Sequence, residues 1–213
     1  WLDAGFRDPA PIAAFLDGLE RRRCIKTHTP LDGIAFGGGT GAGPTYIVVY
    51  RHPVDVHFSM RDHAANMKAD LFPELFPKDI HAGFTRFVDA PLTDSGTDDL
   101  TVAAIVHHYM QARARARGGN VHFFHYADLT RDLAGQIARL AGIMGIKLDP
   151  DLAAALTEAN TFTAMRKVAE DDPARFAKTA LYHDPADFFA SGTSNKWHGR
   201  LNAEALDRYG ARC

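Results

Sequence analysis

Cysteine and long apolar runs are both scarce in this sequence. Only two of its 213 residues are cysteine, Cys24 and Cys213, which is too few for a disulfide framework or a zinc-type ligand spacing. No apolar stretch approaches the roughly 18 residues that indicate a membrane-spanning helix, and no signal peptide is visible. We therefore predict a cytoplasmic protein with reduced thiols and no membrane partner.

A strong excess of charge of either sign is also missing. The chain has 24 Lys and Arg against 26 Asp and Glu, a formal net charge of −2, so no global basic field predicts a nucleic-acid partner. A hydrophobic share of 46% and a charged share of 23% are ordinary for a soluble globular protein. A chain of this length can bury a sizeable core, and we expect one domain over residues 1–213.

Metal-ligand spacing is absent although the sequence contains 11 histidines. His107 and His108 are adjacent within a predicted helix, so their side chains diverge by about 100°. His122 and His125 are three apart within a predicted strand and point to opposite faces. No histidine cluster has the spacing of metal ligands, and we predict no metal site.

Helix and strand signals alternate along the chain. Strands separated by helices of this length indicate a three-layer α/β fold with a central parallel sheet, in which ligands bind at the carboxyl ends of the strands. Residues 67–100, rich in proline and phenylalanine, indicate either a lid or pocket wall or an ordinary surface insertion. We predict strands at 24–27, 46–50 and 121–126, and helices at 9–20, at 53–66, from 102 to the glycines 118 and 119, from 133 to Gly145, and from Pro150 onward.

Two groups of residues suggest transfer chemistry. Lys26 and His28 are separated by one residue, so on a strand an ammonium and an imidazole would share a face. Arg51 follows residues 46–50, which read as a buried strand, and Pro53 suits the first position of a helix. Ser59 lies about two turns into that helix. A cation that faces a helix N-terminus is a natural anion site, and together the two groups indicate transfer from a phosphorylated donor.

These residues also carry a family resemblance. Residues 26–31 (KTHTPL) and 46–59 (YIVVYRHPVDVHFS) resemble the core of the cytosolic-type sulfotransferases, whose patterns run K-T-H-x-P and R-[ND]-[PA]-x-D-V-x-x-S. Three later segments resemble the family patterns F-x-Y-E-D-[LM], T-S-F-x-x-M and F-x-R-K-G-x-x-G-x-W, and they are residues 124–129, 160–165 and 188–197. All five segments occur in the family's order. The resemblance implies the P-loop NTPase-like fold of the sulfotransferases.

One family feature has no counterpart in the sequence. The family opens with a phosphate-binding loop of pattern P-K-S-G-T-T-W, which does not occur here. The glycine-rich residues 37–43 lead into a strand rather than out of one, so we interpret them as a connector. Residues 1–4 resemble a segment that some bacterial members carry beyond the loop. We expect the chain to lack the family's first strand, phosphate loop and first helix, and a natural variant without the loop is the alternative.

The resemblance implies a donor and a mechanism. The donor is 3′-phosphoadenylyl sulfate (PAPS), from which a sulfuryl group passes to a hydroxyl or amine of a small-molecule acceptor without a metal. His28 is the implied general base, because an imidazole accepts protons near neutral pH. Lys26 is the implied cation that stabilises charge on the sulfuryl group. The alternatives are a structural role for His28 and an ordinary surface position for Lys26.

The resemblance also implies a set of donor-binding residues. Arg51 and Ser59 would bind the 3′-phosphate, because a guanidinium and a hydroxyl both donate to phosphate oxygens; a salt bridge from Arg51 to Asp55 is the alternative. Phe162 would stack on adenine or fill the core, and Tyr126 would touch adenine or belong to the core. The implied donor contacts beyond the phosphate pair are Tyr126, Asn160, Thr161, Phe162 and Gly192.

The sequence departs from the family pattern just before Gly192. Ala190 and Ser191 stand where the family has Arg-Lys, so two phosphate-binding cations are missing. We expect the product, 3′-phosphoadenosine 5′-phosphate (PAP), to bind more weakly than in members with both cations, unless Lys196 or Arg200 substitutes for them.

Two other functions remain alternatives, a nucleotide kinase on a similar fold and a non-catalytic PAP-binding module. Kinases of that class depend on Mg²⁺, so a divalent-metal chelator separates them from a sulfotransferase. The phenylalanines of residues 67–87 suggest an apolar or aromatic alcohol as acceptor. The family's dimerisation pattern K-x-x-x-T-V-x-x-x-E is missing, which leaves the oligomeric state open.

Overall fold

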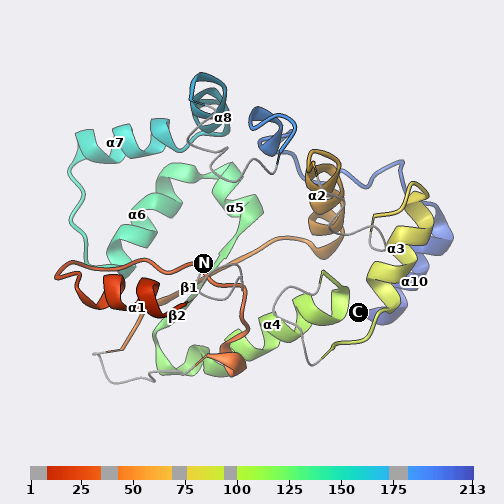
Figure 1. Ribbon diagram of the computed structural model, residues 1–213, viewed down its shortest axis with the longest axis horizontal. Helices are drawn as coiled ribbons and strands as arrows, with labels where there is room; N and C mark the ends of the chain where they lie inside the picture. The colour runs from red at the N-terminus through yellow and green to blue at the C-terminus, as the bar shows by residue number, and fades with distance from the viewer. Residues whose placement is uncertain (1–8, 35–42, 69–75, 94–99, 173–181) are drawn as a thin grey trace.

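The computed structural model describes residues 9–34, 43–68, 76–93, 100–172 and 182–213 (Figure 1). Residues 1–4 and residues 37–42 of the glycine-rich connector lie outside the described residues. The helices are α1 (Pro9–Asp17), α2 (Pro53–Ala65), α3 (Ile80–Asp89), α4 (Val102–Arg115), α5 (Tyr126–Arg131), α6 (Leu133–Ile143), α7 (Pro150–Ala159), α8 (Phe162–Asp171) and α10 (Ala203–Arg212), with short 3-10 helices η1 (Leu31–Gly33), η2 (Ala116–Gly118) and η3 (Ala186–Phe188).

A pair of parallel strands lies among these helices, near the centre of Figure 1. Strand β1 (Tyr46–Tyr50) pairs with β2 (Val121–His125), and the register runs from Tyr46 opposite Val121 to Tyr50 opposite His125. This arrangement confirms the predicted α/β class with a parallel sheet. Because both strands run in the same direction, their carboxyl ends lie at one edge of the sheet, where Arg51 and Tyr126 follow directly.

Two details of the predicted strands are wrong. Residues 22–28 form neither helix nor strand, because a strand needs a neighbour for its backbone hydrogen bonds and the described sheet consists of β1 and β2 alone. Strand β1 is present but only partly buried. Val48 is buried against Leu31 and Val121, whereas Ile47 is 38% and Val49 56% exposed, so the described chain covers only one face of this strand.

The helices predicted from caps and periodicity are present. Pro53 begins α2, and Asp149 caps α7 by accepting a hydrogen bond from the backbone N–H of Leu152. Gly119 ends the α4–η2 segment with φ = 79°, a left-handed conformation that suits glycine. Helix α1 ends at Asp17, three residues before the predicted boundary.

The segment 67–100 contains a core helix that the sequence reading did not predict. Asp79 caps α3 by accepting hydrogen bonds from two backbone N–H groups. Its Phe84 and Phe87 side chains are fully buried and pack with Val54 and Phe58 of α2. The α3 part is therefore core rather than a lid or a surface insertion; residues 69–75 and 94–99 lie outside the described residues.

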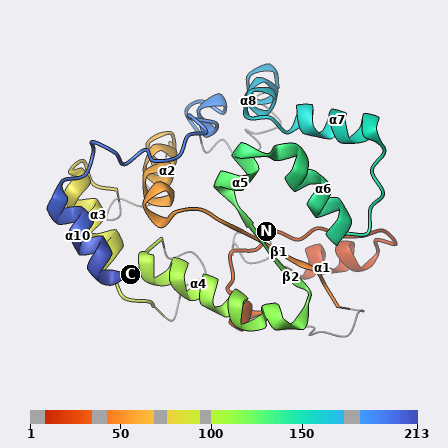
Figure 2. The same ribbon diagram turned by 180° about the vertical axis from the view of Figure 1, so that it is seen from behind.

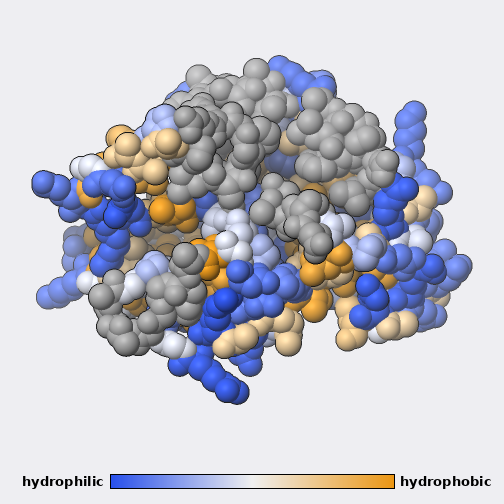
Figure 3. Space-filling view, turned by 60° about the horizontal axis from the view of Figure 1, so that its bottom comes forward, coloured by the Kyte–Doolittle hydropathy of each residue, from blue (hydrophilic) through white to orange (hydrophobic). Residues whose placement is uncertain are grey.

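Two apolar clusters stabilise the arrangement. The larger joins α2, α3, α4 and α10, and the smaller joins both strands to η1 and α4. Helices α3 and α10 lie side by side at one end of the molecule, and α6, α7 and α8 lie toward the other end (Figure 2). On the face of the molecule drawn in Figure 3, apolar residues (orange) form patches that are bordered by hydrophilic residues (blue). Helix α4 keeps Val106, Tyr109 and Met110 exposed, so the described chain covers it only in part.

Candidate active site

The carboxyl end of β1 sends two consecutive side chains into different surroundings. Tyr50 Oη lies 3.0 Å from His108 Nδ1 and 3.2 Å from the His108 carbonyl oxygen, on α4. Arg51 instead stacks over the Tyr126 ring, with its guanidinium carbon 4.3 Å from the ring centroid. Arg51 Nη2 also donates a hydrogen bond to the Thr193 carbonyl oxygen at 2.6 Å. Successive strand residues point to opposite sides, which explains the separation.

The Arg51 guanidinium has a buried donor without a partner. Arg51 Nε is buried and makes no hydrogen bond among the described residues. Buried N–H groups without a partner are rare in proteins because each costs desolvation free energy. A phosphate oxygen would satisfy this donor and match the charge of the guanidinium. The geometry therefore fits an anion site at Arg51.

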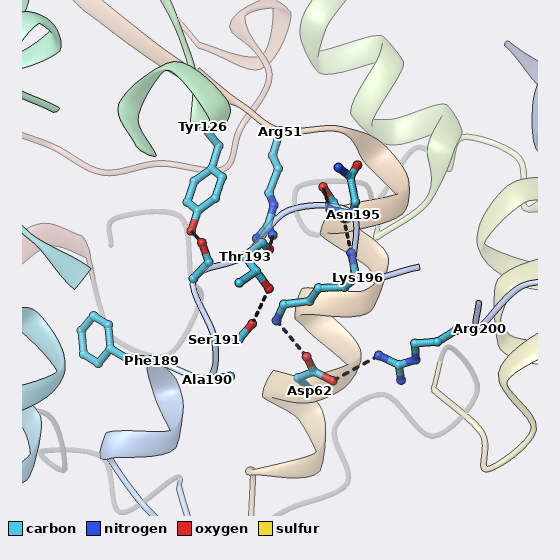
Figure 4. Close-up of polar contacts among 12 residues, drawn as sticks. Arg51, Asp62, Tyr126, Phe189, Ala190, Ser191, Thr193, Asn195, Lys196 and Arg200 are labelled. Carbon is cyan, nitrogen blue, oxygen red and sulfur yellow. Dashed lines mark hydrogen bonds and ion pairs between the residues drawn. The ribbon is translucent and has the colours of Figure 1, made fainter. Parts of the chain in front are cut away.

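Three further predicted donor contacts lie beside Arg51. Tyr126 Oη donates a hydrogen bond to the Gly192 carbonyl oxygen at 3.1 Å (Figure 4). Gly192 has φ = 62°, and a Cβ atom there would lie 2.6 Å from Phe162 Cδ2. Glycine is thus required for both the conformation and the close approach of the phenylalanine. The structure brings Arg51, Tyr126, Phe162 and Gly192 together, as the resemblance implied.

Helix α2 anchors the residues that follow Gly192. Asp55 is buried, and its two carboxylate oxygens accept hydrogen bonds from the backbone N–H groups of Asn195 at 2.9 Å and Lys196 at 3.1 Å. The alternative of a salt bridge between Asp55 and Arg51 is therefore wrong. Ser59 is half-buried one turn further along α2, on the same face as Asp55.

Lys196 and Arg200 do not replace the missing cations before Gly192. Both side chains turn to Asp62 on α2 (Figure 4), where Lys196 Nζ lies 2.9 Å from Oδ2 and Arg200 Nη1 lies 4.0 Å from Oδ1. The Lys196 side chain is only 10% exposed. A lysine so buried and paired is not available to a ligand unless it breaks its contact with Asp62.

Asn160 and Thr161 are occupied by helix ends. Asn160 Nδ2 donates to the Leu156 carbonyl oxygen at 2.8 Å at the end of α7. Thr161 caps α8, and its Oγ1 accepts a hydrogen bond from the backbone N–H of Ala164 at 3.2 Å. Their polar groups therefore fix the turn that presents Phe162 to Gly192, and direct contact of either residue with the donor stays a prediction.

Of the two predicted catalytic residues, His28 is linked to the Tyr50 side of β1 through its effect on His108. Lys26 is exposed and His28 half-buried in the segment that precedes η1. Burial lowers the pKa of His108 on α4, and the neighbouring His107 and His28 lower it further. Asp32 of η1 contacts His107 Nε2 at 2.8 Å and ties this segment to the helix.

Comparison with known proteins identifies the family. A family model described as the sulfotransferase domain matches residues 4–213. The chain belongs to the sulfotransferase family. It is 32% identical over 224 residues to a glycolipid sulfotransferase of Mycobacterium bovis, covering 92% of this chain and 67% of that protein. A glycolipid sulfotransferase of Mycobacterium tuberculosis matches over 223 residues with the same identity and coverage. The family resemblance stated from the sequence is confirmed.

Solved structures of other proteins share the fold of this chain. Retinol dehydratase in complex with androsterone and the inactive cofactor PAP has a TM-score of 0.67 at 21% identity. The match covers 94% of this chain and 55% of the retinol dehydratase chain, so this chain spans about half of that protein's length. A mouse sulfotransferase complexed with PAP has a TM-score of 0.63 at 16% identity, covering 96% of this chain and 68% of that one.

Sequence reasoning missed several residues that shape the candidate site. The sequence suggests Asp55 only as an alternative partner of Arg51, although the family pattern has an aspartate at this position. Asn195 has φ = 62° and stands at the second glycine of the last family pattern, a signal for a left-handed turn. The Tyr50–His108 contact joins residues 58 apart and leaves no local signal in the sequence.

The described residues contain neither a metal-ligand cluster nor a membrane-spanning helix. No group of three or more histidine, cysteine, aspartate or glutamate side chains among them is placed to hold a metal ion. None of the helices in the described ranges is both long enough and apolar enough to cross a membrane.

Proposed function

We propose that this chain carries out PAPS-dependent transfer of a sulfuryl group to a hydroxyl or amine of a small molecule. The observation that carries the proposal is the Arg51 site, in a chain that belongs to the sulfotransferase family. A buried, unpartnered guanidinium nitrogen lies at the end of a parallel strand, beside an aromatic ring and a glycine loop. Such a site suits a nucleotide that carries a phosphate.

The reaction that we propose divides the work between the two sides of β1. His28 takes the proton of the acceptor hydroxyl or amine as the acceptor atom forms a bond to sulfur. The bond between sulfur and the bridging oxygen of PAPS breaks, and PAP leaves with that electron pair. Lys26 stabilises the negative charge on the sulfuryl oxygens during the transfer. Arg51 and Ser59 hold the 3′-phosphate, and Tyr126 and Phe162 contact the adenine ring.

For the acceptor, we propose a hydroxyl group on a small amphiphilic or apolar molecule. The names of the curated relatives, glycolipid sulfotransferases, support this class. The phenylalanines of residues 67–87 give less support than the sequence suggested, because Phe84 and Phe87 fill the core, while Phe72 lies outside the described residues. A cytoplasmic location stays a prediction from the sequence.

The donor site is tested by comparing two ligands that differ only in the 3′-phosphate. Calorimetry would measure PAP and adenosine 5′-phosphate binding to the wild type and to Arg51→Ala. Loss of a charge-assisted phosphate contact costs about 1.5–3 kcal/mol, so PAP binding should weaken by about 10- to 100-fold and adenosine 5′-phosphate binding far less. Arg131→Ala is the matched control, because Arg131 forms an exposed ion pair with Asp128 on α5.

Two results would contradict this assignment. Equal losses for both ligands in Arg51→Ala would mean that Arg51 only supports the fold through Tyr126 and Thr193. A wild-type protein that binds PAP no better than adenosine 5′-phosphate would have no 3′-phosphate site, and the proposed donor would then be wrong.

A further inference from the structure

The loop that contains Gly192 is held by an arginine at each end. Arg51 Nη2 donates to the Thr193 carbonyl oxygen at 2.6 Å. At the other end, Arg166 Nη1 lies 3.2 Å from the Phe189 carbonyl oxygen and 3.5 Å from that of Ala190. The second guanidinium therefore lies at the backbone of the position where the sequence lacks a cation.

Helix α8 brings Arg166 to this loop together with Phe162. The two residues are four apart, so they lie on one face of the helix, one turn from each other. Phe162 meets Gly192 closely enough to exclude a Cβ atom there, and Arg166 meets the loop further back, at residues 189 and 190. One face of α8 thus presents both an aromatic ring and a cation to the same loop.

The charge of Arg166 is available to an incoming anion. Its Nε donates to Glu170 Oε1 at 2.9 Å, and the two side chains are 38% and 50% exposed. Exposed ion pairs of this kind contribute little, so a phosphate competes with the glutamate easily. Arg166 Nη2 has no partner among the described residues. A planar guanidinium with a free terminal nitrogen suits a phosphate oxygen.

The two cationic side chains that follow Gly192 in the sequence are paired with an aspartate on α2. Lys196 and Arg200 both turn to Asp62 on α2, and the Lys196 side chain is only 10% exposed. Lys196 also donates its backbone N–H to Asp55. The recorded polar contacts of both side chains are with Asp62, and none is with residues 189–191. Arg166 is therefore the cation that contacts the Ala190 end of the loop.

We propose that Arg166 supplies, from α8, the positive charge that Ala190 and Ser191 lack, and that it binds the donor's 3′-phosphate together with Arg51. The inference rests on the proposed function. A phosphate dianion bound by two guanidinium groups is satisfied in charge and in hydrogen bonds.

The test measures PAP and adenosine 5′-phosphate binding to Arg166→Gln by calorimetry at low salt. We expect PAP to bind about tenfold more weakly, the lower range for a lost charge-assisted contact, since this side chain is partly exposed. Adenosine 5′-phosphate should change by less than about twofold. Lys167→Gln is the matched control, because Lys167 pairs with Asp171 four residues on, at 2.9 Å, on the same helix. It should bind both ligands like the wild type.

A second variant separates phosphate binding from support of the loop backbone. Adding Ala190→Arg to Arg166→Gln returns a cation to the loop but not the contacts to the Phe189 and Ala190 carbonyl oxygens. Recovery of most of the PAP affinity, with a steeper salt dependence than in Arg166→Gln, would support a charge role. Absence of recovery, or equal weakening of both ligands in Arg166→Gln, would assign Arg166 to loop structure and overturn the proposal.

Failure of this inference is distinguishable from failure of the proposed function. If the wild type prefers PAP, Arg51→Ala loses that preference and Arg166→Gln keeps it, then the donor site stands and only the role of Arg166 is wrong. If the wild type shows no preference for PAP, the donor site itself is wrong and the inference falls with it.

Discussion

A histidine sealed in the aromatic core should make the stability of this protein depend on pH. His57 of α2 is 2% exposed, and its ring lies among the rings of Phe58, Phe76, Phe84 and Phe87 at centroid distances of 4.8–5.6 Å. Neither ring nitrogen has a hydrogen-bond partner among the described residues. Within the described part of the chain no acceptor reaches this ring to stabilise an imidazolium, so the folded protein favours the neutral form.

The size of the effect follows from the pKa of this histidine. Burial, with smaller contributions from the charges of Arg61 and Arg200, lowers the His57 pKa from 6.5 to about 4. Because the unfolded chain binds this proton more readily, the contribution to stability is complete above about pH 6.5 and is lost as the pH falls toward 4. At about 1.4 kcal/mol per pKa unit, the loss is about 3 kcal/mol, a large fraction of the stability of a typical domain.

The assay is chemical denaturation of the wild type and His57→Leu across pH 4 to 8. Leucine has a similar volume and no polar atoms, so the variant should be at least as stable at pH 7 and lose about 3 kcal/mol less by pH 4. Burial also lowers the pKa of His63 and His108, so both proteins lose some stability in acid. The test is therefore the difference between the two proteins in the stability lost from pH 8 to pH 4. His81→Gln, at an exposed position on α3, should behave like the wild type. If the free energy of unfolding falls with decreasing pH as steeply in His57→Leu as in the wild type, this role of His57 is refuted.

Three further results are expected. His28→Ala should lower turnover by at least about 100-fold while PAP affinity stays within about twofold, because a general base acts on the acceptor; near wild-type turnover would remove His28 from the mechanism. Gly192→Ala should cost about 1–2 kcal/mol in denaturation and weaken PAP binding, because the residue has φ = 62° and a Cβ would displace Phe162; an unaltered PAP affinity would mean that Phe162 is not part of the site. A divalent-metal chelator should leave sulfuryl transfer unchanged, and loss of turnover would instead favour the kinase alternative.

The parts of the fold that the sequence predicts are those with local signals. Asp149 and Pro150 mark the start of α7 by themselves, since a capping carboxylate and a first-turn proline act within one helical turn. Gly119 and Gly145 have positive φ and stop helices in the same local way. These features require no knowledge of distant residues.

The errors arise where structure depends on distant partners. Residues 24–27 have an apolar pattern, but a strand exists only where another strand offers its backbone groups. Helix α3 was missed because the prolines around it suggested a loop, while its phenylalanines face a core that α2 and α10 complete. Tertiary packing of this kind overrides local propensity.

The candidate site likewise contains residues that local signals locate and contacts that depend on distant partners. The sequence locates Arg51, Tyr126 and Gly192, because the first two follow strand ends and all three fall in family patterns. Lys196 pairs with Asp62, which is 134 residues away in the sequence. Arg166 contacts the carbonyl groups of residues 189 and 190, which are 23 and 24 residues away. A charge count in the sequence cannot tell which cation is already paired.

The end of β1 joins the two halves of the proposed chemistry. Tyr50 contacts His108 on α4 and Arg51 contacts Thr193, so one peptide unit separates the residue that faces the proposed acid–base side from the residue of the proposed anion site. A change that shifts this strand end must move both sides together. The Asp32–His107 contact, in contrast, holds only the segment that carries the proposed base. Substitutions at Asp32 should therefore alter turnover without altering PAP affinity, whereas substitutions at Tyr50 should alter both.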